Sequence, residues 1–545
     1  MVLASGLALT GCGGAGDAPT GSATLGTTAN INSHPRDDLR DGGNLRLAMT
    51  EYPVNWNTLQ IDGNDGEYSD MIFPMMPRSF ITDASGNLTV NHDYFTDVQM
   101  TSTNPQVVTY TINPKAVWSD GSAITWEDLA SQANALSGKD KAFLIAISNG
   151  FDRVDKVERG VDDRQAVITF RQPYAEWQGQ FAGNAMLYPK NVTHDPDSFN
   201  KSLLQGLGLT SGPFILQSTD KAQGRIVLAR NPKWWGATPK LDTITTSVLD
   251  RATWTAALQN NELDAVLLSD LTDVQNVRTI PALQVRQAPS NRWRHFTFNG
   301  APGSLLADPA LRVAISKGID RQRIADTVLN GLTDHPQPLN NHVFLRGQHG
   351  YQDNNLPFDP DAAAKELDAL GWVRKGDVRE KDGKKLNIRD VMYNDPAWVD
   401  IAKLIQQDLA KIGVGLTIET KPGNRFFADV IQPGDFDVCQ FTFTGDSFPL
   451  ASIPQIWGLY PNDVQANYGR IGSPDLNALI DKTLSEIDPA KAVELANQVD
   501  RKVFEEGHSL PLIQSVGNYG VRSELANYGA PGLASYDYTM IGFLK

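Results

Sequence analysis

Two segments of the chain resemble catalytic or cofactor-binding motifs. Ser218 and Lys221 have the S-x-x-K spacing of serine acylases, but the companion motifs Ser-Asp-Asn and Lys-Thr-Gly do not occur. Residues 206–212 approach a dinucleotide-binding loop, but the third glycine comes one place late. Both segments are expected to be turns. The sequence therefore predicts no catalytic residue and no cofactor.

A histidine repeat is the only pattern that suggests a metal. His335, His342 and His349 recur at intervals of seven residues, but Pro336 and Pro338 prevent a continuous helix from aligning them. A zinc site would also need a fourth ligand at a known spacing, which the sequence lacks. We expect these histidines to make hydrogen bonds in loops, and the sequence predicts no metal site.

Cys12 ends an apolar N-terminal run that resembles an export signal. Residues 1–12 are shorter than the ~20 residues of a membrane-spanning helix. Leu9-Thr10-Gly11-Cys12 resembles the bacterial lipobox, in which the cysteine is diacylated. The basic segment that usually opens such a signal is missing, and the alternative is a chance apolar stretch. Residues 13–41 are rich in small and polar residues and are expected to form a flexible tether.

Composition limits the class of protein. The chain has 545 residues, 41% of them hydrophobic, with 48 Lys and Arg against 63 Asp and Glu and a net charge of −15. The apolar share supports folded cores, and the length suggests about three domains. Because nucleic acid is bound by Lys and Arg that neutralise phosphates, this charge argues against a nucleic-acid partner. Only two cysteines occur, so no disulfide framework is expected.

The first half of the chain mixes strand and helix patterns. Leu45, Leu47 and Met49 alternate as in a strand, and residues 107–112 and 165–170 are rich in β-branched side chains. Between the last two segments, residues 125–128 fit a helix capping box. An α+β subdomain is therefore expected over residues 75–205.

The second half predicts an α/β lobe. Five helix starts combine an N-cap residue with proline at the first helical position. They are Asp308-Pro309, Asp359-Pro360, Asp395-Pro396, Ser473-Pro474 and Asp488-Pro489. The helix from Pro396 ends near Gly413 and lies between strand-like residues 386–391 and 414–418, an order that favours parallel strands.

Eight segments in consistent order resemble a known family. They are residues 42–46, 117–128, 211–214, 228–236, 258–265, 298–299, 308–314 and 318–321. The segments look like those of the family 5 extracellular solute-binding proteins of ABC importers, most of all the oligopeptide-binding lipoproteins of mycobacteria and related actinobacteria. One departure is Asn261, which stands where glycine is common in the family.

The resemblance implies an α/β, bilobal fold of the periplasmic-binding-protein type. Two hinge segments would cross between the lobes, and the α+β subdomain would be inserted in the first lobe. The expected divisions are signal 1–12, tether 13–41, first lobe 42–74, 206–296 and 516–545, inserted subdomain 75–205 and second lobe 297–515.

The family implies a function in transport. The chain would not be an enzyme but would capture oligopeptides outside the membrane, held there by its lipid anchor. It would deliver them to the permease and ATPase subunits of an ABC importer, and we expect a monomer when free. Two alternatives stay open. The same fold binds glutathione, haem, metal complexes or oligosaccharides in other members, and a lipoprotein scaffold or chaperone would need no transport partner.

In relatives that bind peptides, an acidic residue within an aromatic and acidic segment pairs with the peptide's amino terminus. Phe443, Thr444, Gly445 and Asp446 resemble that segment, which makes Asp446 the candidate carboxylate. Such a group can form a charge-assisted hydrogen bond with an ammonium. The alternative is a helix N-cap that faces solvent.

Asp62, Gly63 and Asn64 fall where the family's first lobe presents backbone and an acidic residue to the ligand. An ordinary turn is an equally good explanation for them.

Three further residues lie near the expected cleft. Asn341 and His342 occupy a proline-flanked loop, and Trp293 precedes the expected hinge. An aromatic residue there either covers the ligand or packs in the core.

Overall fold

The computed structural model describes residues 29–545, apart from 147, 269–270, 423–425, 446 and 462–463. Its centre is a six-stranded sheet in the order β11-β19-β12-β18-β16-β17. The strands are β11 (Ala265–Leu267), β12 (Leu283–Phe298), β16 (Asn387–Tyr393), β17 (Gly415–Lys421), β18 (Val438–Thr444) and β19 (Ser509–Arg522).

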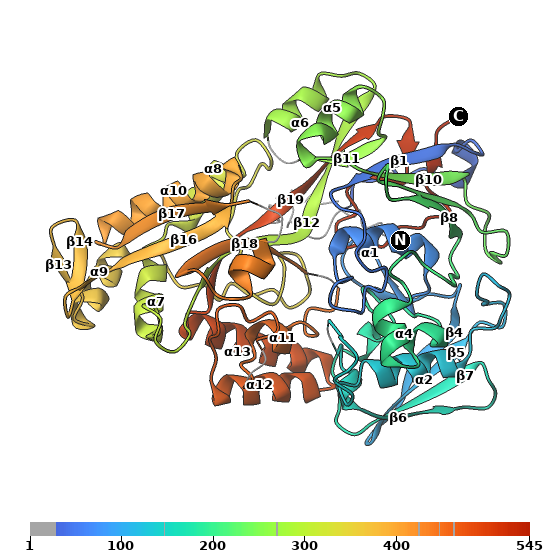
Figure 1. The fold of residues 1–545 in the computed structure, drawn as a ribbon, viewed down its shortest axis with the longest axis horizontal. Helices are drawn as coiled ribbons and strands as arrows, with labels where there is room; N and C mark the ends of the chain where they lie inside the picture. The colour runs from blue at the N-terminus through green and yellow to red at the C-terminus, as the bar shows by residue number, and fades with distance from the viewer. Residues whose placement is uncertain (1–28, 147, 269–270, 423–425, 446, 462–463) are drawn as a thin grey trace, which may run out of the picture.

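β12 and β19 link the two halves of the molecule. They are antiparallel neighbours along most of their length, from Leu283 opposite Arg522 to Thr297 opposite Ser509. Figure 1 shows them side by side between the elements of the first lobe and those of the second. The chain therefore crosses between the lobes through two paired strands, which is the expected arrangement of two hinge segments.

The first lobe holds a four-stranded sheet in the order β1-β10-β9-β8, with β1 and β10 parallel. Its strands are β1 (Asn44–Met49), β8 (Phe214–Asp220), β9 (Arg225–Arg230) and β10 (Thr243–Val248). A second four-stranded sheet, β4-β5-β7-β6, carries the inserted α+β part of this lobe. Its strands are β4 (Phe95–Thr103), β5 (Gln106–Ile112), β6 (Val154–Arg159) and β7 (Gln165–Phe170).

The β-α-β unit predicted in the second lobe is present. Helix α10 (Pro396–Lys411) follows β16 and precedes β17, and the two strands are parallel. Gly413 has a φ of +78°, a value that suits glycine just after a helix end. Ile401, Ile405 and Leu409 share one buried face of α10 in the core of this lobe.

The predicted helix caps are also confirmed. The side chains of the five N-cap residues accept hydrogen bonds from backbone N–H groups of the first turn. Thr125 and Asp128 form the predicted capping box. Proline at the first helical position costs nothing there, because its missing N–H would have had no partner within the helix.

The remaining elements complete the two lobes. The other α-helices are α1 (Gly66–Ile72), α2 (Trp126–Ala135), α3 (Lys190–Thr193), α4 (Pro196–Lys201), α5 (Trp254–Gln259), α6 (Leu271–Arg278), α7 (Pro309–Lys317), α8 (Arg321–Val328), α9 (Pro360–Ala369), α11 (Ile453–Trp457), α12 (Pro474–Ser485) and α13 (Pro489–Glu505). Short strands are β2 (Phe80–Thr82), β3 (Leu88–Val90), β13 (Val373–Lys375), β14 (Val378–Lys381), β15 (Lys384–Lys385), β20 (Leu525–Ala526) and β21 (Gly542–Phe543). Single turns are η1 (Arg36–Asp38), η2 (Phe73–Met75), η3 (Phe151–Arg153), η4 (Trp177–Gly179), η5 (Arg251–Thr253) and the π-helical η6 (Phe427–Ile431).

The end of the expected tether differs from the prediction. Residues 29–41 are packed on the body: Asn30 pairs with Ala530, Leu39 pairs with Leu544, and the Leu39 side chain is buried. The physical reason is that the C-terminal segment offers unpaired backbone groups and an apolar surface to this stretch. Cys12 and residues 13–28 lie outside the described residues.

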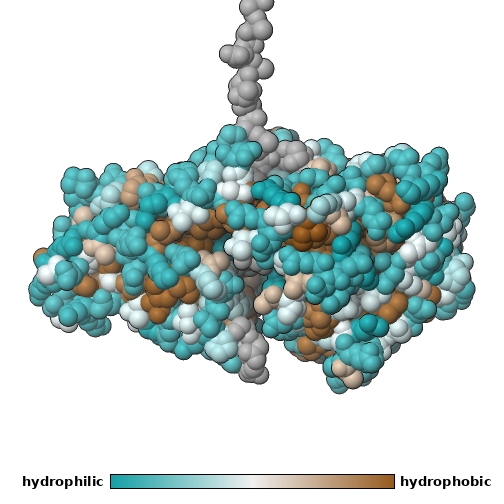
Figure 2. Space-filling view, turned by 90° about the horizontal axis from the view of Figure 1, so that it is seen from above, coloured by the Kyte–Doolittle hydropathy of each residue, from teal (hydrophilic) through white to brown (hydrophobic). Residues whose placement is uncertain are grey.

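The surface is mainly polar. Figure 2 shows a face that is hydrophilic over most of its area, with hydrophobic residues gathered in patches on both sides of the molecule. In the part of the chain that the structure describes, no helix combines the length and the apolar character needed to cross a membrane.

Candidate functional site

A cavity of about 320 Å³ lies where the two lobes meet. Most of its wall belongs to the first lobe, and the end of β18 with the residues after it closes one side. Its polar lining includes Glu67, Asp70, Arg78, Asn184, Arg251, Ser290, Asn291, Arg292, Thr444, Ser447, Tyr519, Tyr528, Ser535, Tyr536 and Tyr538. A volume of this size is at the lower end of the range for small-molecule sites, roughly 300–1,000 Å³.

An irregularity in β12 brings part of this strand to the cavity. The pairing of β12 with β19 is in register up to Pro289 and shifts before it resumes at Trp293. Proline cannot donate a ladder hydrogen bond and is typical of such interruptions. The backbone locally bends, and residues 289–292 line the cavity. Asn291 then holds the second lobe, since its backbone oxygen accepts from Gly445 N at 2.8 Å and its Nδ2 donates to Gly445 O at 2.9 Å.

Three arginines reach the cavity from three different elements. Arg78 lies over the Phe73 ring, with 4.4 Å from the guanidinium carbon to the ring centroid, and Arg251 lies over Trp254 at 4.0 Å. Arg292 belongs to β12 and reaches the first residue of α1. One of its guanidinium nitrogens lies 4.0 Å from the position that a Cβ atom on Gly66 would take. Burial lowers the pKa of Arg78 and of Arg251. A cavity wall with three cationic groups attracts carboxylates.

Helix α1 supplies two carboxylates. Glu67 Oε2 accepts from Thr50 N and Thr50 Oγ1, both at 2.8 Å, which ties the helix to the end of β1. Asp70 lines the cavity and is exposed to it. Desolvation by the surrounding protein raises its pKa to about 6. Arg292 and Arg78 favour its ionised form, whereas Glu67 opposes it.

Four tyrosines complete the wall next to Asp70. Tyr519 comes from β19, and the others come from the C-terminal segment that follows β20. The rings of Tyr528 and Tyr536 stack with their centroids 4.9 Å apart, and Tyr538 lies 6.0 Å from Tyr536. Burial raises the pKa of Tyr519 to about 12, so its hydroxyl stays neutral near pH 7.

The predicted second-lobe segment lies partly on the cavity. Thr444 and Gly445 line it, as do Ser447 and Phe448. Asp446 itself lies outside the described residues. Phe443 is not among the residues that line the cavity, and it stacks on the buried His295 with ring centroids 4.5 Å apart. The aromatic ring of this segment is thus packed against the core, and the described residues after it line the cavity.

Trp293 packs in the core. Only 4% of the residue is exposed, and its ring centroid lies 5.4 Å from that of Phe443 and 5.1 Å from that of His295. It is not among the residues that line the cavity. Of the two roles considered for Trp293, the structure therefore fits packing in the core.

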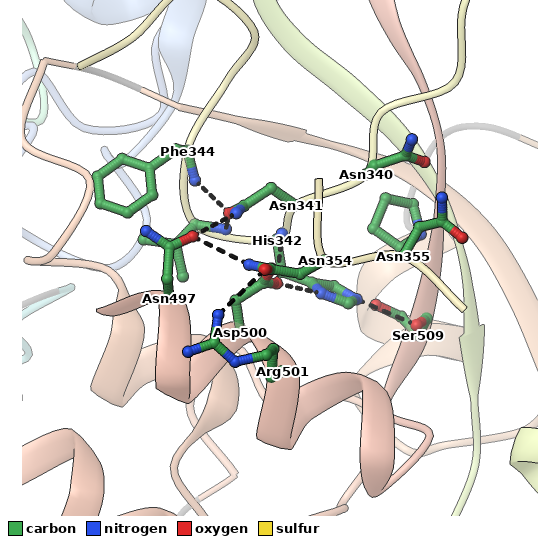
Figure 3. Close-up of polar contacts among 12 residues, drawn as sticks. Asn340, Asn341, His342, Phe344, Asn354, Asn355, Asn497, Asp500, Arg501 and Ser509 are labelled. Atoms are coloured by element: carbon green, nitrogen blue, oxygen red, sulfur yellow. Dashed lines mark hydrogen bonds and ion pairs between the residues drawn. The ribbon is translucent and has the colours of Figure 1, made fainter. Parts of the chain in front are cut away.

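Asn341 and His342 belong to a buried polar network that fixes their loop to α13 (Figure 3). His342 Nδ1 lies 2.7 Å from Asp500 Oδ1, and its Nε2 lies 3.1 Å from the backbone oxygen of Ser509. Asn341 Nδ2 donates to Asn497 Oδ1 at 3.0 Å. Neither residue lines the cavity.

The first-lobe turn at residues 62–64 is also separate from the cavity lining. Asp62 accepts a hydrogen bond from Gln60 Nε2 at 3.1 Å and is exposed, as is Asn64. Gly63 is required by packing, since a Cβ there would stand 2.1 Å from Asn57 O. Among the described residues, no cluster of three or more His, Cys, Asp or Glu is arranged to hold a metal ion.

Comparison with known proteins identifies the family. A sequence model described as "Bacterial extracellular solute-binding proteins, family 5 Middle" matches residues 90–463. The chain belongs to this family. It is 53% identical to the oligopeptide-binding protein OppA of Mycobacterium tuberculosis H37Rv over 99% of this chain and 92% of that protein.

Two solved structures share the fold. The periplasmic EDTA-binding protein EppA superposes with a TM-score of 0.86 at 24% identity, covering 96% of this chain and all of that one. The oligopeptide-binding protein AppA of Bacillus subtilis, solved with a nonapeptide, gives 0.79 at 18% identity, covering 93% and 100%. The bilobal α/β fold class expected from the family resemblance is confirmed.

Several residues that line the cavity were missed by sequence reasoning. Pro289 within a strand-like run signals a bulge, which would have drawn attention to Arg292. Arg251 and Trp254 form a cation–π pair at helix spacing, a further local signal. Asp70 and the C-terminal tyrosines carry no such signal, since only folding brings them together.

Proposed function

We propose that this chain captures oligopeptides in the cavity between its lobes and delivers them to an ABC importer. The observation that carries the proposal is the 53% identity to the mycobacterial oligopeptide-binding protein OppA over 99% of the chain. The cavity supports it, because both lobes contribute lining residues and a ligand that touches both favours the closed arrangement.

The chemistry of the wall suits a peptide. Carboxylates and arginines lie on the same cavity, so both ends of a zwitterionic chain have partners of opposite charge. Neutral tyrosine hydroxyls and the amides of Asn184 and Asn291 add hydrogen-bonding groups for a peptide backbone. Asp446 follows Thr444 and Gly445 in sequence, and we assign it to the peptide's amino terminus as part of this proposal.

The proposal includes a location and partners. Cys12 would carry two acyl chains and hold the protein at the outer face of the cell membrane, because a single chain binds only marginally. The permease and ATPase subunits of the importer would receive the peptide. The protein would act as a monomer when free.

Mass spectrometry of the molecules that the purified protein releases tests the function directly. The protein is purified without refolding, denatured, and the released small molecules are sequenced by tandem mass spectrometry. We expect short peptides in an amount close to one per protein. The absence of peptides, together with no binding of a synthetic peptide mixture by the ligand-free protein, would contradict the proposal.

One observation favours a second candidate, a polycarboxylate or its metal complex. Arg78, Arg251 and Arg292 place three guanidinium groups on one cavity, which suits several carboxylates at once. The EDTA-binding protein EppA shares this fold. Calorimetric titration with EDTA and with its iron complex would detect such a ligand, and tight binding in the absence of peptide binding would favour it.

A further inference from the structure

Gln514 lies in β19 at the place where the pairing of β12 with β19 is interrupted. The register ends with Pro289 opposite Val516 and resumes with Trp293 opposite Gln514. Between these two pairs β12 has three residues, 290–292, whereas β19 has one. These three residues form a bulge, and the excess of residues leaves part of the β12 backbone without partners in the ladder.

The Gln514 side chain bridges the interruption. Its Nε2 donates to Ser290 O at 2.9 Å, and its Oε1 accepts from the backbone N–H of Arg346 at 3.0 Å. Only 1% of Gln514 is exposed, so both hydrogen bonds are made away from solvent. One amide therefore supplies the partner of a carbonyl in the bulge and of an N–H in a loop of the second lobe.

The bulge that Gln514 holds is part of the cavity wall. Ser290, Asn291 and Arg292 line the cavity, whereas Gln514 does not. Ser290 Oγ accepts from the backbone N–H of Arg292 at 3.1 Å, which fixes the turn within the bulge. Asn291 pairs twice with Gly445, through its backbone oxygen and its Nδ2. A shift of Ser290 would therefore move Asn291 and Arg292 with it.

The loop at Arg346 also contacts the second-lobe side of the cavity. Leu345 packs on Gly445, since a Cβ on Gly445 would stand 3.2 Å from Leu345 Cδ1. The Arg346 guanidinium donates twice to Pro338 O, at 3.1 and 2.9 Å, and so fixes the loop that carries both residues. The bulge, the cavity residue after β18 and this loop therefore hold one another, with Gln514 between the bulge and the loop.

We propose that Gln514 is a positioning residue for ligand binding, which sets the bulge at residues 290–292 so that Asn291 meets Gly445. It acts through the bulge and not by touching the ligand. Because binding groups must be held to within about 0.5 Å, a displaced bulge weakens both the ligand contacts and the contact between the lobes. This inference rests on the proposed peptide-binding function and adds how the crossing strands shape the site.

The experiment compares Gln514→Met and Gln514→Asn with a matched control, Gln106→Met. Methionine has a similar length but makes neither hydrogen bond, and asparagine is too short to bridge both partners. Gln106 is also 1% exposed, and its side chain donates to Tyr174 O at 3.1 Å and accepts from Tyr174 N at 2.7 Å, outside the cavity lining. The control therefore loses the same kind of buried hydrogen bonds without a link to the bulge.

Two quantities are measured on the full-length proteins, under conditions where each is folded. Calorimetry with trialanine, pentaalanine and a mixture of random pentapeptides gives the affinity. Hydrogen exchange without ligand reports the opening of the Gly445 N–H, which bonds to Asn291 O. We expect both Gln514 variants to bind peptide about tenfold more weakly and to exchange Gly445 faster, while Gln106→Met matches the parent in both. If one Gln514 variant does not fold, the other decides.

The outcomes separate the inference from the function. Equal peptide affinities in the parent and the Gln514 variants would overturn the inference and leave the function standing, as would an equal loss of affinity in Gln106→Met. A parent protein that binds none of the peptides would overturn the proposed function instead. In that case the exchange of Gly445 decides whether Gln514 positions the bulge, and a rate unchanged in both variants would overturn the inference as well.

Discussion

His342 Nδ1 and Asp500 Oδ1 lie 2.7 Å apart, and both side chains are fully shielded from solvent. The same carboxylate oxygen accepts from the His342 backbone N–H at 2.7 Å, and Oδ2 accepts from Asn354 at 2.7 Å. Asp500 therefore fixes a loop of the second lobe to α13, and His342 Nε2 continues the contact to the backbone oxygen of Ser509 in β19. Neither His342 nor Asp500 lines the cavity, so this pair is expected to act on stability and not on ligand binding.

Asp500→Ala should destabilise the protein by about 3–5 kcal/mol, because it removes one partner of a buried pair and leaves several donors without an acceptor. Urea unfolding measures the change. Asp163→Ala is the control, since its ion pair with Arg159 has both side chains exposed, and it should cost well under 1 kcal/mol. If His342 instead contacts the ligand, His342→Gln should lose affinity for peptide under conditions where the variant is fully folded.

Asp390 should make stability depend on pH. Burial raises its pKa from 3.8 to about 8, and Asp390 Oδ1 and Gln440 Oε1 have no hydrogen-bond partner among the described residues. The folded state therefore keeps the proton that the unfolded state loses above about pH 4. The free energy of unfolding that this retained proton contributes is fully present below the unfolded pKa. It is lost as pH rises toward 8, by about 1 kcal/mol per pH unit.

Asp390→Asn should remove this loss, since an amide stays neutral and can donate to Gln440. Thermal unfolding at pH 5, 6, 7 and 8 measures the effect as the difference between variant and parent, which should grow with pH. Asp408→Asn is the matched control: Asp408 is also buried but is paired with Arg323 at 2.8 Å and Lys411 at 2.9 Å. It should destabilise, and a difference for Asp390→Asn that does not vary with pH would contradict the prediction.

Asp446→Asn should weaken the binding of peptides with a free amino terminus on the order of 2–4 kcal/mol, since it removes a charge-assisted contact inside an enclosed site. N-acetylated peptide should bind the parent poorly and should lose little more in the variant. Calorimetry with both peptides on both proteins gives the coupling energy. Additive effects would place the amino terminus of the peptide at another group.

Glu176 should stabilise the closed arrangement of the lobes. Its carboxylate accepts from the backbone N–H groups of Leu450 at 3.1 Å and Ala451 at 2.6 Å, just after cavity residue Phe448. The contact joins the inserted part of the first lobe to the second lobe. Glu176→Ala should therefore raise the peptide dissociation rate and shift the population toward an open form.

Small-angle scattering with and without a peptide mixture measures this closure. The parent should become more compact with peptide, and Glu176→Ala should need more peptide for the same change. Glu158→Ala, on an exposed strand of the same inserted part, is the control. An unchanged radius of gyration in the parent would favour the scaffold alternative over a binding protein that closes.

Cys12→Ala should release the protein from the membrane, because two acyl chains anchor stably whereas the short apolar stretch before Cys12 cannot span. Fractionation of cells that express the parent or the variant measures the shift from membrane to soluble fraction. A variant that stays with the membrane to the same extent as the parent would show that the lipobox does not anchor the protein.

Local features of the fold could be predicted from the sequence because they depend on neighbouring residues. Asp395-Pro396 sets a helix start by one side-chain hydrogen bond and one fixed φ angle, and Gly413 ends the helix because it accepts a positive φ. The motif order further indicated the family and hence the bilobal fold. The residues at which each lobe and the inserted subdomain begin and end remain predictions.

The cavity depends on tertiary structure. Asp70, Arg292 and Tyr519 are far apart in the chain and meet only because β12 pairs with β19 and α1 packs beside them. The same holds for His342, whose partner Asp500 lies 158 positions further along. A sequence pattern reports spacing along one element, whereas the charges around Asp70 come from several elements at once. Sequence therefore determined the helices, strands and family of this protein, and only the folded chain decided which charged groups face a ligand.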